Sequence, residues 1–218
     1  MNLFSFLLEN PNEVGIKLLQ HLYLFAVSWA IAVVVGISIA ILATRRGHEK
    51  IGRVVLSVTG AAQSVPSIAI IAIVFIFLGI GAAPAIVALF LYSLVPITFN
   101  SASGFMSVEP AMKEAARGMG MTERQILRKV ELPVSIPAIA SGARSAATIN
   151  IGTATIAAVI GAGGLGEIIF VGLRLTNQTM IFAGALPAAL LAVVVDALLA
   201  LVERGLTSPG IQFGRDEF

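Results

Sequence analysis

The residues from 54 to 108 form a run of 55 positions without a single Asp, Glu, Lys or Arg. As one continuous α-helix this run would be about 80 Å long, whereas the hydrocarbon core of a bilayer is about 30 Å thick. The run is therefore too long for one membrane crossing and predicts two. Glycine and proline permit tight turns, so we expect the chain to reverse direction at 79–84, where the sequence reads GIGAAP.

The composition of the whole chain also indicates a membrane protein. Hydrophobic residues make up 57% of the 218 positions and charged residues 12%, and the mean hydropathy is +0.95. A soluble domain carries roughly 25% charged residues because its surface must face water. A soluble enzyme, a secreted domain and a disordered linker are therefore poor interpretations. We predict an all-α integral membrane protein of one domain, residues 1–218, whose five spans lie at about 22–44, 54–78, 83–104, 140–161 and 180–202.

The distribution of basic residues predicts the orientation of these spans, because loops rich in Lys and Arg remain in the cytoplasm. Of the 14 basic residues, only Lys17 and Arg174 fall on the opposite side, and Arg144 lies near a membrane boundary. We therefore expect the N-terminus outside and the C-terminus in the cytoplasm. The residues assigned to the cytoplasmic side are Arg45, Arg46, Lys50, Arg53, Lys113, Arg117, Arg124, Arg128, Lys129, Arg204 and Arg215.

The chain lacks the residues that several kinds of catalytic and binding site require. The chain has no Cys and only two His, His21 and His48, which argues against thiol chemistry and against a His-based metal site within one chain. It contains no phosphate-binding loop of the G-x-x-x-x-G-K-[ST] type. The segment GAGGLG at 161–166 fits a dinucleotide-binding pattern, but no alternation of strands and helices surrounds it. We expect a flexible turn at the outer membrane face instead, with the chain re-entering at 168–170 and glycines that let an external protein approach.

The connection from 105 to 133 has the pattern of a helical hairpin outside the membrane. Pro110 suits the first turn of a helix that Gly118 and Gly120 would end. Thr122 is a candidate N-cap for a second helix.

Prolines predict further helix ends and breaks. We expect Pro133 and Pro137 to end the second helix of the hairpin and to mark the return to the membrane. Pro66, Pro96 and Pro187 lie within spans, where a break frees backbone groups that must find partners or line a wet path.

The residues of the hairpin also follow a particular spacing. Glu114-Ala115-Ala116 is followed after three positions by Gly120, and after nine more by Val130-Glu131-Leu132-Pro133. This spacing resembles the EAA loop of ABC importer permeases. The segments at 63–67 (QSVPS), 84–86 (PAI), 149–170 and 185–207 resemble permeases of the glycine betaine/carnitine/choline, or osmoprotectant, type. The resemblance covers most of the chain from about residue 60 and implies a type I ABC importer permease fold.

In that family the EAA loop forms a coupling helix that sits in a cleft of a cytoplasmic ATPase. The resemblance therefore implies an ATPase dimer, a second permease chain (identical or related), an extracellular or periplasmic substrate-binding protein and the lipid bilayer as partners, and no nucleic acid. It implies a non-catalytic chain that binds no cofactor, with ATP and Mg on the ATPase, in the bacterial inner membrane. The residues carried over as coupling residues are Glu114, Ala115, Ala116, Gly118, Gly120, Leu132 and Pro133.

Polar residues within the spans are candidates for the translocation pathway, although ordinary hydrogen bonding between helices is the alternative for each. These candidates are Ser64, Pro66, Ser67, Asn100, Asn150, Thr153 and Thr155. Arg144 and Asp196 are the ionisable residues closest to the bilayer interior, and we predict that they form an interhelical pair with a structural role.

Two other functions stay open at this point. A permease of a methionine-type amino-acid importer would share the EAA loop and the GAGGLG turn. A non-transporting membrane scaffold could also dock an ATPase. An intramembrane enzyme is a poor interpretation, because the spans contain neither paired acids nor a cluster of metal ligands.

Overall fold

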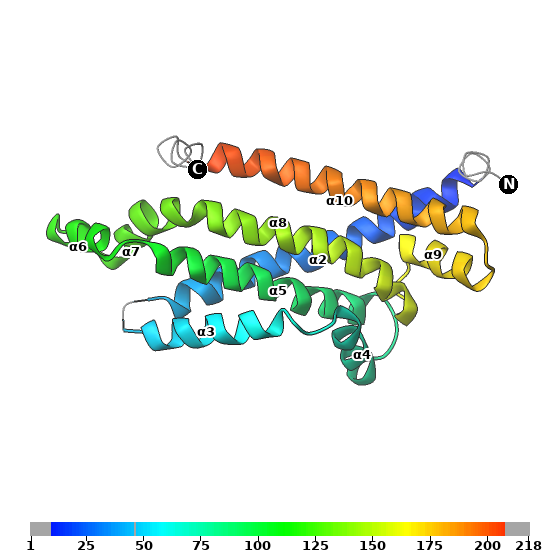
Figure 1. Cartoon of the computed structure of the whole chain (residues 1–218), viewed down its shortest axis with the longest axis horizontal. Helices are drawn as coiled ribbons and strands as arrows, with labels where there is room; N and C mark the ends of the chain where they lie inside the picture. The colour runs from blue at the N-terminus through cyan, green and yellow to red at the C-terminus, as the bar shows by residue number, and fades with distance from the viewer. Residues whose placement is uncertain (1–9, 46, 208–218) are drawn as a thin grey trace. The chain divides into compact units, whose positions relative to one another are not determined.

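The computed structural model describes residues 10–45 and 47–207, and every regular element in them is a helix (Figure 1). Arg46 and Arg215, which entered the prediction of orientation, lie outside the described residues. The element η1 is one turn of π-helix and η2 one turn of 3₁₀-helix. In chain order the elements are α2 (Pro11–Ala43), α3 (Glu49–Ala62), α4 (Ser67–Leu78), α5 (Ala82–Ser107), α6 (Pro110–Gly118), α7 (Glu123–Ile126), η1 (Leu127–Glu131), α8 (Leu132–Ala157), η2 (Ala158–Ile160), α9 (Leu165–Arg174) and α10 (Gln178–Leu206).

The apolar helices overlap the predicted spans, although α2 begins at Pro11 rather than at 22 and the helical run that contains α8 begins at Glu123 rather than at 140. In the described part of the chain, four stretches are long and apolar enough to cross a membrane: α2, α5, the continuous helical run Glu123–Ile160, and α10. The bent pair α3 and α4 makes a fifth if it counts as one span. The predicted all-α class is therefore confirmed, although the segment 54–78 is two helices rather than one.

The reversal between the two halves of the charge-free run lies where it was predicted. Helix α4 ends at Leu78, and Gly79 and Gly81 follow with φ angles of +78° and +119°. These values lie in a region that side chains with a Cβ rarely adopt, so glycine is required there. Helix α5 then starts at Ala82, and the Gly81 N–H donates to the Ile160 carbonyl at 2.8 Å.

The prolines interrupt fewer helices than predicted. Pro66 caps α4 in an extended conformation (φ −60°, ψ 135°), so a helix does break there. The breaks expected at Pro96 and Pro187 are wrong, because α5 and α10 continue through them. The helix end expected at Pro133 and Pro137 is also wrong, since both lie within α8. Each proline removes only one N–H donor, and a membrane-spanning helix tolerates that loss when its other backbone bonds remain.

The chain divides into two compact units, each assembled from three stretches of sequence. Among the described residues, the first unit comprises 10–32, 64–94 and 146–196, and the second comprises 33–45, 47–63, 95–145 and 197–207. Helices α2, α5, α8 and α10 contribute residues to both units.

The first unit has two apolar clusters. One buries Leu24, Ile71, Leu89 and small residues of α5 and α8 such as Ala154. The other joins α9 to the start of α10 through Leu165, Ile168, Ala183 and Ala188. Small residues permit close approach of these helices: a Cβ at position 166 would overlap the backbone of Thr155.

The second unit packs around Phe105, which is 1% exposed. Ala40 of α2, Ala102 of α5, and partly buried Val55, Leu132 and others surround it. Glycines again sit where helices meet: a Cβ at position 142 would lie 3.0 Å from the Pro96 carbonyl oxygen, and one at position 104 would lie 2.9 Å from the Ala138 Cβ. This unit also holds the predicted hairpin.

Candidate functional site

The hairpin of residues 110–131 (below, the hairpin) has the start and end of the first helix and the start of the second where the sequence predicted them, whereas the second helix continues into α8. Pro110 is the first residue of α6, and the helix ends at Gly118. Gly120 has a φ of +78°, a left-handed conformation that favours glycine. Thr122 caps α7 with a complete capping box: its Oγ1 accepts from the Gln125 N–H, and Gln125 Oε1 accepts from the Thr122 N–H at 2.8 Å.

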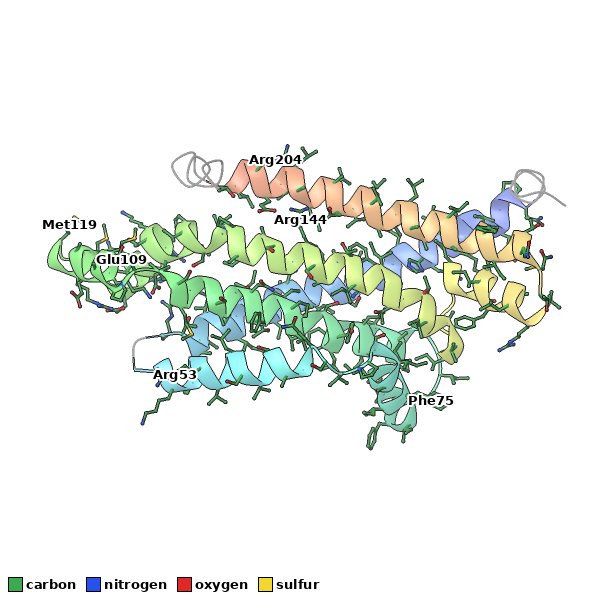
Figure 2. All side chains as sticks on the ribbon, viewed as in Figure 1. Arg53, Phe75, Glu109, Met119, Arg144 and Arg204 are labelled. Carbon is green, nitrogen blue, oxygen red and sulfur yellow. The ribbon has the colours of Figure 1, made fainter. Side chains whose placement is uncertain are left out.

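The predicted coupling residues do not all lie on one accessible surface. Glu114, Ala115, Gly118 and Gly120 are exposed, and the neighbouring Met119 is 71% exposed at the end of the hairpin (Figure 2). The remaining three coupling residues are at least partly buried. The four exposed residues are therefore the surface that a partner could reach. Ala116 is 1% exposed, and Leu132 and Pro133 are half-buried, Leu132 against the Phe105 cluster.

A buried carboxylate links the hairpin to the end of α2. Glu131 is 5% exposed, and its Oε2 accepts from Arg45 Nη1 at 2.7 Å while its Oε1 lies 3.1 Å from Lys113 Nζ. Arg45 is itself held in place, because its Nε donates to the Ile41 carbonyl at 2.9 Å and its guanidinium lies 5.8 Å from the centroid of the Phe105 ring. Arg45, Lys113 and Glu131 are called the Glu131 cluster below.

Glu131 lies within the spacing that resembles the EAA loop, but the sequence did not indicate a role for it. One signal was available: an acid at the start of an apolar span is costly unless a cation pairs with it. Which of the many cations would pair could not be read from the sequence, because Arg45 is 86 positions away.

A cavity of about 370 Å³ adjoins the Glu131 cluster within the second unit. Its walls carry both signs of charge together with apolar residues such as Phe105 and Met106, so the cavity is close to neutral. The charged residues that line it are Arg45, Arg53, Lys113, Arg117, Glu114, Glu123 and Glu131. Among them, Arg117 Nε donates to Glu123 Oε1 at 3.0 Å, and this hydrogen bond raises the pKa of the Arg117 guanidinium.

The candidate pathway residues occupy different environments. Ser64 and Pro66 are exposed and Ser67 is half-buried, all at the break before α4. Asn100 is half-buried and Thr155 partly buried, and each bonds to a carbonyl of its own helix: Asn100 Nδ2 to Pro96 at 2.8 Å and Thr155 Oγ1 to Gly152 at 2.7 Å. These contacts leave Ser64, Pro66 and Ser67 as the most accessible candidates.

Asn150, in contrast, is the centre of a buried network in the first unit. It is 0% exposed, and its Nδ2 donates to Ser93 Oγ at 2.7 Å and to Ser28 Oγ at 2.9 Å. Ser28 Oγ in turn donates to the Leu24 carbonyl at 2.7 Å. Helices α2, α5 and α8 are thereby joined. The contacts of Asn150 are those of interhelical hydrogen bonding, and Thr153, 4% exposed, is likewise buried.

The predicted turn at 161–166 is present, and its glycines face the chain itself. Gly161, Gly163 and Gly164 have φ angles between +74° and +78°. The Gly164 N–H donates to Gln20 Oε1 at 3.1 Å, and a Cβ at position 163 would lie 2.6 Å from that same oxygen. A Cβ at position 164 would lie 3.2 Å from His21 Nδ1. The turn therefore needs glycine in order to pack against α2, whatever approaches from outside.

Arg144 of α8 makes an ion pair with α10 within the second unit. Its Nη1 donates to Glu203 Oε2 at 2.7 Å, and Glu203 is 7% exposed (Figure 2 labels Arg144). The sequence prediction named Asp196 as the partner and did not foresee Glu203. Pairing of Arg144 with Asp196 stays a prediction.

A family model described as a binding-protein-dependent transport system inner membrane component matches residues 32–208. The chain belongs to this family. Family membership makes it a multi-pass protein of the inner membrane.

Relatives match the chain over almost its whole length. A glycine betaine/carnitine/choline transport permease of Bacillus subtilis is 38% identical over 210 residues, 96% of each chain. A carnitine transport permease of Listeria monocytogenes is 40% identical and covers 97% of this chain and 96% of its own. An osmoprotectant import permease of Salmonella typhimurium is 39% identical and covers 97% and 100%. The chain is therefore similar to osmoprotectant permeases from end to end.

Solved structures show the same fold. An inward-facing structure of the MetNI methionine ABC transporter is 24% identical, with a TM-score of 0.77 over 90% of this chain and 97% of that one. An amino acid ABC transporter with histidines is 23% identical, with a TM-score of 0.75 over 94% and 98%. The predicted type I ABC importer permease fold is confirmed.

Proposed function

We propose that the chain is the membrane-spanning subunit of an ATP-driven importer of osmoprotectants such as glycine betaine, carnitine or choline. The observation that carries this proposal is the 38–40% identity to osmoprotectant permeases over nearly the full length of both chains. The methionine and amino acid transporters are matched at only 23–24% identity and support the fold alone.

The hairpin is the proposed contact with the ATPase. Its accessible residues Glu114, Ala115, Gly118 and Gly120 include three without a bulky side chain, which allows close approach of a partner backbone. Glu114 supplies a charge to the same surface. The hairpin is tied to the membrane helices through its packed side, so a docked partner can move them.

The proposed orientation has the second unit on the cytoplasmic side and the N-terminus outside. Of the basic residues that the structure describes, all except Lys17 and Arg174 belong to the second unit, and this asymmetry supports the assignment by the positive-inside rule. The proposed complex contains two ATPases, a second permease chain and a substrate-binding protein. ATP and Mg are bound by the ATPases, and this chain contributes no catalytic group and no cofactor.

Uptake by the whole transporter in proteoliposomes tests the substrate. We expect ATP-dependent accumulation of labelled glycine betaine, carnitine or choline, and no accumulation of labelled methionine. Accumulation of methionine instead would support the amino-acid alternative. ATPase binding without uptake of any of these substrates would support a scaffold.

A further inference from the structure

The hairpin is covalently continuous with only two membrane helices. It follows α5 after residues 108–109, and it runs through α7 and η1 into α8 without a break. Helices α2 and α3 connect to it along the chain only through α4 and α5. Contacts between side chains are therefore the direct route by which movement of the hairpin reaches α2.

Two kinds of contact are available to carry that movement. The apolar contacts around Phe105 include Ile41 at the end of α2 and Leu127 and Leu132 of the hairpin side. Such contacts are non-directional and permit sliding. The hydrogen bond from Arg45 to Glu131 has a fixed direction and, at 2.7 Å, the length of a strong charge-assisted bond.

The contacts of the Glu131 cluster hold its side chains in place when the hairpin moves. Glu131 is buried, and its two oxygens contact cations from two different elements, Arg45 beside α2 and Lys113 of α6. Lys113 also donates to the Phe105 carbonyl at 3.3 Å. Glu131 is the last residue before α8, and its carboxylate connects this point to the end of α2 through Arg45 and to α6 through Lys113. Lys113 adds the connection to the end of α5.

We propose that Glu131 is a positioning residue that makes the end of α2 move together with the hairpin when the ATPase moves α6. The proposal rests on the proposed function, because it takes the hairpin as the site where the ATPase docks. Loss of the Arg45–Glu131 bond should leave ATPase docking and ATP hydrolysis in place, whereas the end of α2 no longer follows the hairpin.

The test compares two variants with the same change. Arg45→Gln removes the charged bond between the end of α2 and Glu131 but leaves Glu131 paired with Lys113, so the buried acid keeps a cation. Arg144→Gln is the matched control, since it removes an Arg–Glu bond of the same 2.7 Å length in the same unit, away from the hairpin. In the reconstituted transporter, we expect Arg45→Gln to lower substrate imported per ATP hydrolysed by about 10-fold, a coupling effect of ordinary size. The control should leave this ratio unchanged.

An equal ratio for Arg45→Gln and the wild type would overturn the proposal, and so would an equal fall for Arg144→Gln. If Arg45→Gln does not assemble, Arg45→Lys replaces it. Lysine keeps the charge but cannot bond both Glu131 and the Ile41 carbonyl as arginine does, so we expect a fall of about 3-fold, and a wild-type ratio contradicts the role.

A second readout does not depend on substrate. The chain has no cysteine, so Leu42→Cys and Lys129→Cys, at exposed positions outside the proposed docking surface, can carry two spin labels without background from this chain. We expect ATP binding to leave the distance between the labels unchanged in otherwise wild-type protein and to change it in Arg45→Gln. The same distances in both proteins contradict the proposal. Failure of all osmoprotectant uptake by the wild type counts against the proposed function and leaves this measurement to decide the role of Glu131.

Discussion

Asn150→Ala is predicted to destabilise the protein rather than to alter substrate affinity. Asn150 is fully buried, and its amide donates to two serines on two other helices, Ser93 and Ser28. The substitution therefore breaks two interhelical bonds at once. A residue that lined an open pathway would instead face substrate or water.

The size of the effect follows from the contacts. Two interhelical hydrogen bonds at about 0.6 kcal/mol each, the average in a membrane protein, contribute about 1 kcal/mol. The vacated space adds on the order of 1–2 kcal/mol. Asn150 Oδ1 has no hydrogen-bond partner in the described part of the chain, and its removal returns on the order of 1 kcal/mol. The net loss is about 2 kcal/mol, which corresponds to a fall in Tm of about 4–8 °C in a chain of this size.

Thermal unfolding of the purified complex in detergent, at one fixed scan rate, measures this shift, and uptake measures KM. Asn100→Ala is the matched control, because Asn100 is half-buried and donates only to Pro96 of its own helix. We expect its Tm to fall by less than about 3 °C. The reasoning is refuted if both variants shift Tm equally, or if Asn150→Ala keeps the wild-type Tm and raises KM.

Three further substitutions test other parts of the structure. Gly120→Asp should abolish uptake while the ATPase still co-purifies. Gly120→Asn tolerates the same left-handed backbone without the charge and should keep most of the uptake. Equal uptake by both variants contradicts a charge effect at the docking surface. Gly166→Ala should prevent assembly because the added methyl overlaps the backbone of α8. Gly152→Ala should assemble normally, because a Cβ at position 152 meets nothing within 4 Å. The yield of co-purified transporter measures assembly, and equal yields of the two variants contradict this reasoning. If Arg144 pairs with Asp196 as predicted, the losses of Tm in Arg144→Gln and Asp196→Asn should not add in the double variant, and fully additive losses exclude the pair.

The positions of the helices could be predicted largely from local sequence. The reversal at 79–81 and the ends of α6 depend on glycines with positive φ, and such backbone angles leave a direct signature in the residue type. Pro96 and Pro137 misled the prediction for the opposite reason. A proline only lowers the stability of a helix, and packing by neighbouring helices decides whether the helix continues.

The partners within the candidate site could not be predicted in the same way. Glu131 could have paired with any of several nearby cations, and the structure pairs it with Arg45 and Lys113. The sequence did not show what the glycines at 163 and 164 pack against, and the structure places Gln20 and His21 there. The approach of an external protein to this turn stays a prediction. The Arg45–Glu131 and Gln20–Gly164 contacts join residues more than 80 positions apart along the chain, and no local pattern encodes the distance between them.

The sequence by itself determined that this protein lies in a membrane, since a charge-free run of 55 residues has no other stable environment. It also determined the hairpin, because its spacing and capping residues act over a few positions. Only the tertiary structure decided which polar residues are accessible and which are buried links between helices. Asn150 and Glu131 are such links, because the helices that pack around a polar side chain determine whether it meets a partner or solvent.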